Sequence, residues 1–197
     1  LVAIKRTTRI MTGMKNLKIL HLEDSLADAE LIRLELDEYF GNCEIIHTID
    51  RNSYEKALTE NEFHIILSDY NVPGIHGLES LELAQEINSI PIIYVSGAIG
   101  EERAVEMLKA GATDYVLKNK LEKLPLAIER ALKEKLSREK LLQKEEELKA
   151  SHSFKTSIIN AIKEHILVIN DKGMIMDVND GWKTFFKSNL DSFNFLE

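Results

Sequence analysis

The sequence predicts an α/β protein built on a doubly wound, five-stranded parallel sheet, followed by a long helix and a small α+β segment. Short apolar runs rich in β-branched residues alternate with stretches of helical periodicity, turn residues follow several of them, and no segment repeats. The clearest run is FHIIL at 63–67, which has polar residues on both sides. Such a run suits a strand that is buried on both faces of a parallel sheet.

Strands and helices are expected to alternate from residue 17 onward. The strands are predicted at residues 18–22, 43–48, 63–69, 91–95 and 114–117. The helices are predicted from Ser25, from Ser53 through Leu58, at 78–87, at 101–110 before Gly111, and from Leu124 onward. Ser25 is a favourable N-cap, and Ala29, Ile32 and Leu36 follow it at helical spacing.

Composition narrows the class of protein. With 44% apolar and 29% charged residues in 197, the chain resembles ordinary soluble proteins, and its net charge of −8 argues against a nucleic-acid footprint. Cys43 is the only cysteine, which excludes an intrachain disulfide framework and favours a reducing compartment. No run approaches the roughly 18 apolar residues of a membrane span, and residues 1–16 lack a signal-peptide core. We therefore expect a cytoplasmic protein, with residues 1–16 as a tail.

Chemically active side chains follow four of the predicted strands. Glu23 and Asp24 follow the first strand, Asp69 ends the third, and Ser96 and Lys118 follow the fourth and fifth. The carboxyl ends of parallel strands meet at one edge of the sheet, where ligands bind in such folds. Taken alone, Asp69 has an equally good explanation as a turn residue. Its predicted neighbours favour a functional role.

The predicted cluster also indicates a chemistry. Carboxylates at Glu23, Asp24 and Asp69 would repel one another unless a cation neutralised them. Their oxygen ligands suit Mg²⁺, a hard ion that keeps several waters. An ionised Asp69 beside Mg²⁺, the Ser96 hydroxyl and the Lys118 ammonium has the nucleophile, positive charge and donors that phosphoryl transfer needs.

On these motifs, residues 17 to about 133 resemble the receiver domain of two-component response regulators. The resemblance implies a flavodoxin-like sheet with strand order 2-1-3-4-5. It also implies Mg²⁺-dependent transfer of a phosphoryl group from phosphohistidine on a cognate histidine kinase or phosphotransfer protein. Such a receiver catalyses its own phosphorylation and dephosphorylation. No kinase catalytic domain is recognised in this chain, and a parent histidine kinase is one expectation.

Roles carry over residue by residue from this resemblance. They are Asp69 as phospho-acceptor, Glu23 and Asp24 as the acidic Mg²⁺ pair, Asn71 as the backbone-carbonyl ligand, Ser96 as the hydroxyl that follows the phosphoryl group, Lys118 as the phosphate-binding lysine, and Tyr115 as the aromatic switch. Phosphorylation is then expected to change the face formed by the fourth helix, fifth strand and fifth helix. Two positions depart from the family pattern. Asn119 replaces the usual proline after Lys118, and His76 stands where many members have Asp.

Beyond the receiver, assigned to residues 17–123, the composition becomes strongly charged. Residues 124–153 are expected to continue the last receiver helix as a coiled-coil linker, because a sparse leucine stripe runs through Leu132, Leu136 and Leu142. A solvated single helix is the alternative to a homodimer through this stripe. The run from Val95 to Pro125 also resembles receivers that precede sensory domains in larger signalling proteins.

Residues 154–197 resemble the opening of a PAS sensory domain. Two strand-like runs, HILVIN and MIMDVN, flank the turn residues Asp171-Lys172-Gly173, and Asn179 closes the second run. Aromatic residues at 182, 185 and 186 follow on a helical segment. We expect the truncated N-terminal part of such a domain, in a receiver–PAS protein for which a hybrid histidine kinase is one parent architecture.

Three alternative functions remain open from the sequence. A phosphate-independent receiver-like interaction module would be expected to have lost at least one of the acidic, hydroxyl or lysine motifs. A flavodoxin-like cofactor binder would need a phosphate-cradling loop after the first strand, where Glu23-Asp24 repel phosphate. His152 loosely matches the phosphorylation site of histidine kinases, but Ser153 replaces the acidic residue that normally follows.

Overall fold

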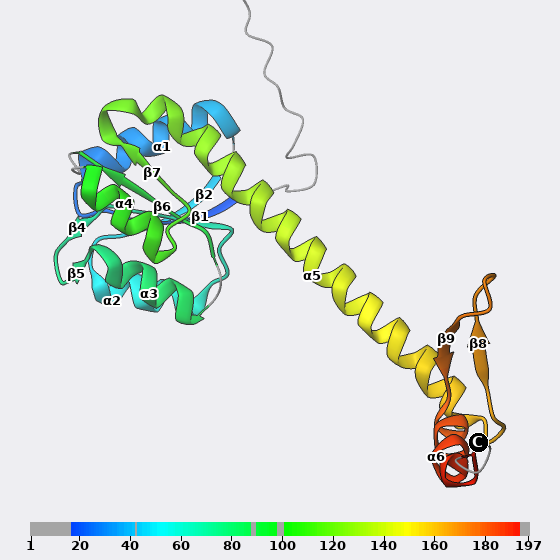
Figure 1. Cartoon of the computed structure of the whole chain (residues 1–197). Coiled ribbons are helices and arrows are strands. Elements are labelled where there is room, and N and C mark those ends of the chain that lie inside the picture. The colour runs from blue at the N-terminus through cyan, green and yellow to red at the C-terminus, as the bar shows by residue number, and fades with distance from the viewer. Residues whose placement is uncertain (1–16, 42, 88–89, 98–100, 194–197) are drawn as a thin grey trace, which may run out of the picture. The chain divides into compact units, whose positions relative to one another are not determined.

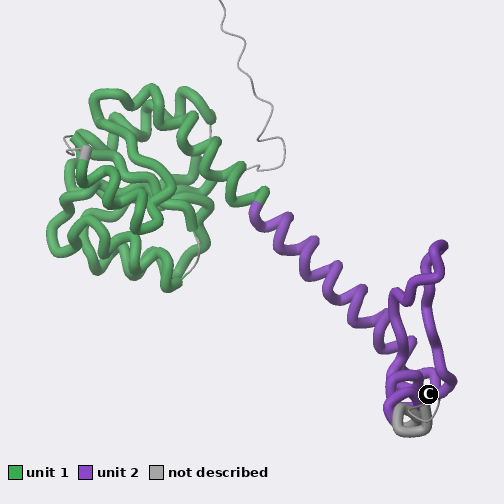
Figure 2. The backbone as a smooth tube through the Cα atoms, in the orientation of Figure 1, with its two compact units in different colours: residues 1–137 green, residues 138–197 purple. Residues whose placement is uncertain are grey.

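The chain divides into two compact units, residues 1–137 and 138–197 (Figure 2). The computed structural model describes residues 17–41, 43–87, 90–97 and 101–193. The tail expected at residues 1–16 lies outside the described residues. Helix α5 (Leu124–Ala161) belongs to both units, because the boundary between them falls within it.

The first unit is organised around a parallel sheet of five strands in the order β2-β1-β3-β6-β7 (Figure 1). Its strands are β1 (Leu17–Leu22), β2 (Cys43–Thr48), β3 (Ile65–Ser68), β6 (Ile92–Ser96) and β7 (Asp114–Leu117). The short strands β4 (Asn71–Val72) and β5 (Ile75–His76), which the sequence did not predict, form a separate antiparallel ladder. Counted along the main sheet alone, the order is the expected 2-1-3-4-5, so the predicted fold class is confirmed for this unit.

Helices cover both faces of this sheet. They are α1 (Leu26–Phe40), α2 (Arg51–Glu60), α3 (Gly77–Ile87), α4 (Glu101–Ala110) and the start of α5, with the 3₁₀ turn η1 (Lys118–Lys123) before it. One core contains Ile32 of α1 and Ile128 of α5, and the other contains Tyr54 of α2, Leu81 of α3 and Met107 of α4. Strands β3 and β6 are buried along their whole length between these cores, as their continuous apolar runs predict.

Two helix starts test the capping argument. Ser25 caps α1 as expected, since its Oγ accepts a hydrogen bond from Asp28 N at 3.3 Å. The predicted helix α2 is present, but its predicted start was wrong: Asp50 is the cap, and its Oδ1 accepts from Ser53 N at 2.8 Å. Asp50 N in turn donates to Ser53 Oγ at 3.3 Å, which completes a capping box, so Ser53 lies inside the helix that it was expected to open.

The second unit contains the end of α5, a hairpin and a final helix. The hairpin strands are β8 (Leu167–Ile169) and β9 (Ile175–Val178), and α6 covers Asp180–Phe193. Gly173 adopts φ +78° in the turn, where a residue with a side chain would be strained. The predicted hairpin is confirmed. Ile158 and Ile159 lie in the last turns of α5.

Candidate functional site

Backbone hydrogen bonds fix the ends of β1 and β3 beside each other. Asp69 N donates to Leu22 O at 2.8 Å, and Glu23 N donates to Thr48 O at 2.9 Å. Residues just beyond the strands therefore continue the register of the sheet for one more step. This places the Glu23 and Asp69 side chains at the same carboxyl edge.

Lys118 occupies the centre of this edge. Its Nζ lies 2.7 Å from Glu23 Oε2, 2.7 Å from Asp28 Oδ2 and 2.8 Å from Asp69 Oδ2. The Glu23 side chain is fully buried, whereas 16% of Lys118 and 12% of Asp69 are exposed. One ammonium thus faces three carboxylates in a partly buried pocket, which leaves an excess of negative charge.

The surroundings of Lys118 and Glu23 shift the pKa of each side chain. Burial by itself would lower the pKa of Lys118, but hydrogen bonds to Asp28, Asp69 and Glu23 raise it above its ordinary value. Burial raises the pKa of Glu23, and the nearby Lys118 ammonium offsets only part of that effect. Lys118 is therefore a fixed positive charge at neutral pH.

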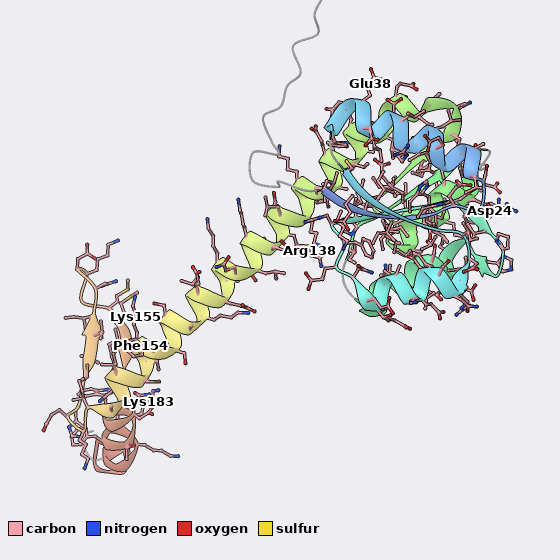
Figure 3. All side chains as sticks on the ribbon, turned by 180° about the vertical axis from the view of Figure 1, so that it is seen from behind. Asp24, Glu38, Arg138, Phe154, Lys155 and Lys183 are labelled. Atoms are coloured by element: carbon pink, nitrogen blue, oxygen red, sulfur yellow. The ribbon has the colours of Figure 1, made fainter. Side chains whose placement is uncertain are left out.

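The acidic residues also form a candidate metal site. Glu23, Asp24 and Asp69 each offer a carboxylate oxygen, and these oxygens lie within 4.8 Å of one another. Asp24 is exposed at one end of the sheet (Figure 3). The donors are all oxygens, two of the carboxylates already share one lysine, and the third faces solvent. This set fits a hard divalent ion that retains water, such as Mg²⁺.

The other predicted site residues occupy distinct places. Asn71 is the exposed residue of strand β4, and its backbone N is 3.5 Å from Asp69 Oδ1. Ser96 is the buried last residue of β6, in register with Leu117 immediately before Lys118. Tyr115 is partly buried and packs against the core on the α2–α3–α4 face, outside the group of ion pairs.

The two departures from the family pattern have simple structural outcomes. Lys118 and Asn119 are the first residues of η1, all peptide bonds of the described residues are trans, and Lys120 adopts φ −137° within the turn. His76 is exposed in β5, where its backbone N donates to Glu79 Oε2 at 3.0 Å. The His76 side chain is thus exposed to solvent on this surface loop.

Sequence reasoning missed three residues of this pocket. Asp28 binds Lys118 from the first turn of α1, and its place one turn after Asp24 was the available signal. His47 Nε2 lies 2.7 Å from Glu23 O, and the His47 and His21 ring centroids are 5.6 Å apart. Burial, the neighbouring His47 and the Lys118 charge lower the pKa of His21 to about 3, so it is a neutral residue beneath the site.

An acidic pocket with a central lysine at the carboxyl edge of this sheet is the arrangement of a CheY-like receiver. The chain belongs to the response regulator receiver domain family, whose model matches residues 19–129. Chemotaxis protein CheY-3 of Vibrio cholerae is 25% identical over 108 residues, which cover 53% of this chain and 82% of CheY-3. Response regulator ArlR of Staphylococcus saprophyticus is 34% identical over 101 residues, covering 51% of this chain and 45% of ArlR.

Solved structures agree with this assignment. A CheY-like receiver domain protein from Methanospirillum hungatei superimposes with a TM-score of 0.56 at 25% identity, covering 62% of this chain and 98% of that protein. The family implies a histidine kinase or phosphotransfer partner within a two-component system. In the described part of the chain, no helix has both the length and the apolar character needed to span a bilayer.

Proposed function

We propose that Asp69 accepts a phosphoryl group from phosphohistidine on a partner kinase or phosphotransfer protein. The observation that carries this proposal is the position of the Lys118 ammonium, 2.8 Å from the Asp69 carboxylate and beside Glu23. All five motif residues of the expected machinery are present, which disfavours a phosphate-independent module. The site therefore has a nucleophile, a fixed cation and an acidic pair for Mg²⁺.

The chemical step follows from these groups. An Asp69 carboxylate oxygen attacks phosphorus, the new O–P bond forms, and the P–N bond of phosphohistidine breaks with its electron pair going to the imidazole, which takes up a proton from solvent. Lys118 holds a phosphoryl oxygen and neutralises its charge throughout. Bound at Glu23, Asp24, Asp69 and the Asn71 carbonyl, Mg²⁺ would supply further positive charge against the phosphoryl oxygens.

Intact-mass spectrometry with acetyl phosphate as the donor tests this proposal. The chain should gain one phosphoryl group in the presence of Mg²⁺ and none with EDTA, and Asp69→Asn should abolish the gain. Asp171→Asn, which changes an exposed aspartate in the hairpin turn, is the matched control and should behave as the parent. Phosphate uptake by Asp69→Asn at the parental level would refute the assignment.

The readout is proposed to run through Ser96 and Tyr115. A phosphoryl group on Asp69 would draw the Ser96 hydroxyl toward it. The half-buried Tyr115 ring would then fill the space that the Ser96 side chain leaves. The face of α4, β7 and α5 would change shape as a result. Phosphorylated Ser96→Ala should lack the NMR shifts around Tyr115 that the parent shows, and unchanged shifts would disprove the coupling.

We propose that residues 124–153 also link two copies of the chain. Leu136 and Leu142 of this stripe are 48% and 53% exposed on α5, so a monomer leaves them in water. Leu132 is buried in the receiver core and is unsuitable for a test of the linker. Sedimentation equilibrium at tens of micromolar should show a dimer that Leu136→Glu with Leu142→Glu dissociates. A parental monomer would exclude this interface.

Residues 154–197 are proposed to be the start of a PAS-like sensory domain in a larger signalling protein, a hybrid histidine kinase being one candidate. Ile169, Ile175 and Met176 of the hairpin are 56%, 63% and 66% exposed. A two-stranded sheet with such apolar faces needs further strands or helices to cover it. Amide hydrogen exchange in β8 and β9 should therefore be faster than in β1 and β3. Equally slow exchange would contradict the proposal.

A further inference from the structure

Four hydroxyl-bearing side chains meet beneath the loop that carries Asp69. They are Ser68 of β3, Ser80 of α3, Tyr94 of β6 and Tyr54 of α2, here called the hydroxyl cluster. All four side chains are buried, with at most 2% exposure. Buried hydroxyls need partners, so the bonds within this cluster constrain the elements that contribute to it.

The hydroxyl cluster binds both ends of the acceptor loop, defined as residues 69–77. At its start, Ser68 Oγ donates to Asp69 O at 2.9 Å. At its end, Ser80 Oγ donates to Gly77 O at 3.0 Å, and Tyr94 Oη donates to the same carbonyl. Ser68 Oγ and Ser80 Oγ are 3.2 Å apart, so the hydroxyls that bind the two ends are direct neighbours.

Tyr94 anchors this cluster to the sheet. Its Oη lies 2.9 Å from Ser80 Oγ, and its ring makes an edge contact with Tyr70 in the loop at a centroid distance of 6.4 Å. In the sheet, Tyr94 is in register with Ser68 on one side and with Tyr115 on the other. The Tyr94 side chain therefore contacts the acceptor loop. Its strand, β6, lies between β3, which leads to Asp69, and β7, which carries Tyr115.

The acceptor loop has to place two expected Mg²⁺ ligands, the Asp69 carboxylate and the Asn71 carbonyl. Within the loop, the β4–β5 ladder and a hydrogen bond from Gly77 N to Tyr70 O at 3.1 Å supply local order. These contacts do not connect the loop to the neighbouring strand β6. The Tyr94 and Ser80 hydroxyls make that connection.

We infer that Tyr94 and Ser80 are positioning residues for phosphorylation at Asp69. They hold the Gly77 end of the acceptor loop against α3 and β6 while Ser68 binds its Asp69 end, which keeps the loop at the spacing at which Asp69 and Asn71 can bind the same Mg²⁺. This inference rests on the proposed function of Asp69. It predicts that removing either hydroxyl weakens the use of Mg²⁺ without altering a group that touches the phosphoryl donor.

Tyr54 provides a matched control inside the same cluster. It is fully buried like Tyr94, and its Oη donates to Ser80 O at 2.9 Å. That carbonyl lies one turn into α3, so the Tyr54 hydroxyl binds helix backbone and neither end carbonyl of the acceptor loop. Tyr54→Phe and Tyr94→Phe remove the same atom from equally buried sites.

The experiment measures the rate of phosphorylation by acetyl phosphate at graded Mg²⁺ concentrations, followed by intact mass. Tyr94→Phe and Ser80→Ala should raise the Mg²⁺ concentration for half-maximal rate by about five- to tenfold, the effect of roughly one buried hydrogen bond. Tyr54→Phe should stay within about twofold of the parent, while its core amides show a loss of protection comparable to that of Tyr94→Phe.

The outcomes separate the inference from the proposed function. A parent that takes up no phosphate at any Mg²⁺ concentration refutes the proposed function and the inference with it. A parent that is phosphorylated, with Tyr94→Phe and Ser80→Ala both matching Tyr54→Phe, overturns the inference alone. If Tyr94→Phe fails to fold, the comparison of Ser80→Ala with Tyr54→Phe tests the inference in the same way.

Discussion

Lys118→Met removes the ammonium that the Glu23, Asp28 and Asp69 carboxylates share. Methionine keeps an unbranched chain of similar length, so the change acts mainly on charge. Glu23 would lose its ion-pair partner while fully buried, and breaking a buried pair in this way costs about 3–5 kcal/mol. Asp69 is 12% exposed and Asp28 36% exposed, and solvent screens both, so we expect the lower end, about 3 kcal/mol.

The pH dependence of this loss follows from Glu23. Burial raises the pKa of Glu23 in the folded state, so the folded chain holds that proton more tightly than the unfolded chain does. Stability associated with protonated Glu23 is present below its unfolded pKa and is lost as pH rises through the folded pKa. Without Lys118 the folded pKa rises further, and the deficit of the variant should shrink when pH falls from about 7.5 to about 5.

Amide exchange in β1 and β3, in buffer with EDTA, measures this free energy within the first unit. Lys123→Met, at an exposed lysine of η1, is the matched control and should lie within about 0.5 kcal/mol of the parent. Adding Glu23→Gln to Lys118→Met should recover at least half of the loss. A deficit below about 1 kcal/mol, or one unchanged by Glu23→Gln, would refute the charge argument.

Three further predictions concern other parts of the chain. A Cβ on Gly77 would overlap the Tyr70 ring, so Gly77→Ala should lower the unfolding free energy by about 1–3 kcal/mol, and Tyr70→Ala in the same chain should relieve most of that loss in urea titrations. The Asn179 side chain binds Ile162 O, Glu164 O, Ile166 N and Trp182 N, so Asn179→Ala should loosen the second unit and red-shift the emission of the single tryptophan. Burial, together with the nearby Asp37 charge, raises the pKa of Cys43 to about 11, so alkylation by iodoacetamide at pH 8, followed by mass, should be about a hundredfold slower than for a free thiol and should still rise steeply at pH 10.

Much of the fold was predictable because it depends on local patterns. Continuous apolar runs indicated β3 and β6, and both strands are buried along their length. The edge position of Glu23, Asp69 and Lys118 was also predictable, since every parallel strand ends on the same side of the sheet. These inferences need only the period of each segment and the alternation of strands with helices.

Other features depended on contacts between elements distant in the sequence. Asp28 reaches Lys118 only because α1 packs with its first turn over the end of β7, a distance of 90 residues along the chain. The meeting of Ser80 with Tyr94 likewise depends on how α3 crosses β6. The spacing of Ser80 and Tyr94 in the sequence does not show whether their hydroxyls are buried and hydrogen-bonded or exposed to solvent.

The sequence by itself thus determined the order of the main-sheet strands and their helices, and the edge at which the reactive groups gather. The tertiary structure decided which buried polar groups form hydrogen bonds and ion pairs with one another. The physical reason is that burial and hydrogen bonding act over about 3 Å, a range set by helix rotation and sheet register and not by spacing along the chain.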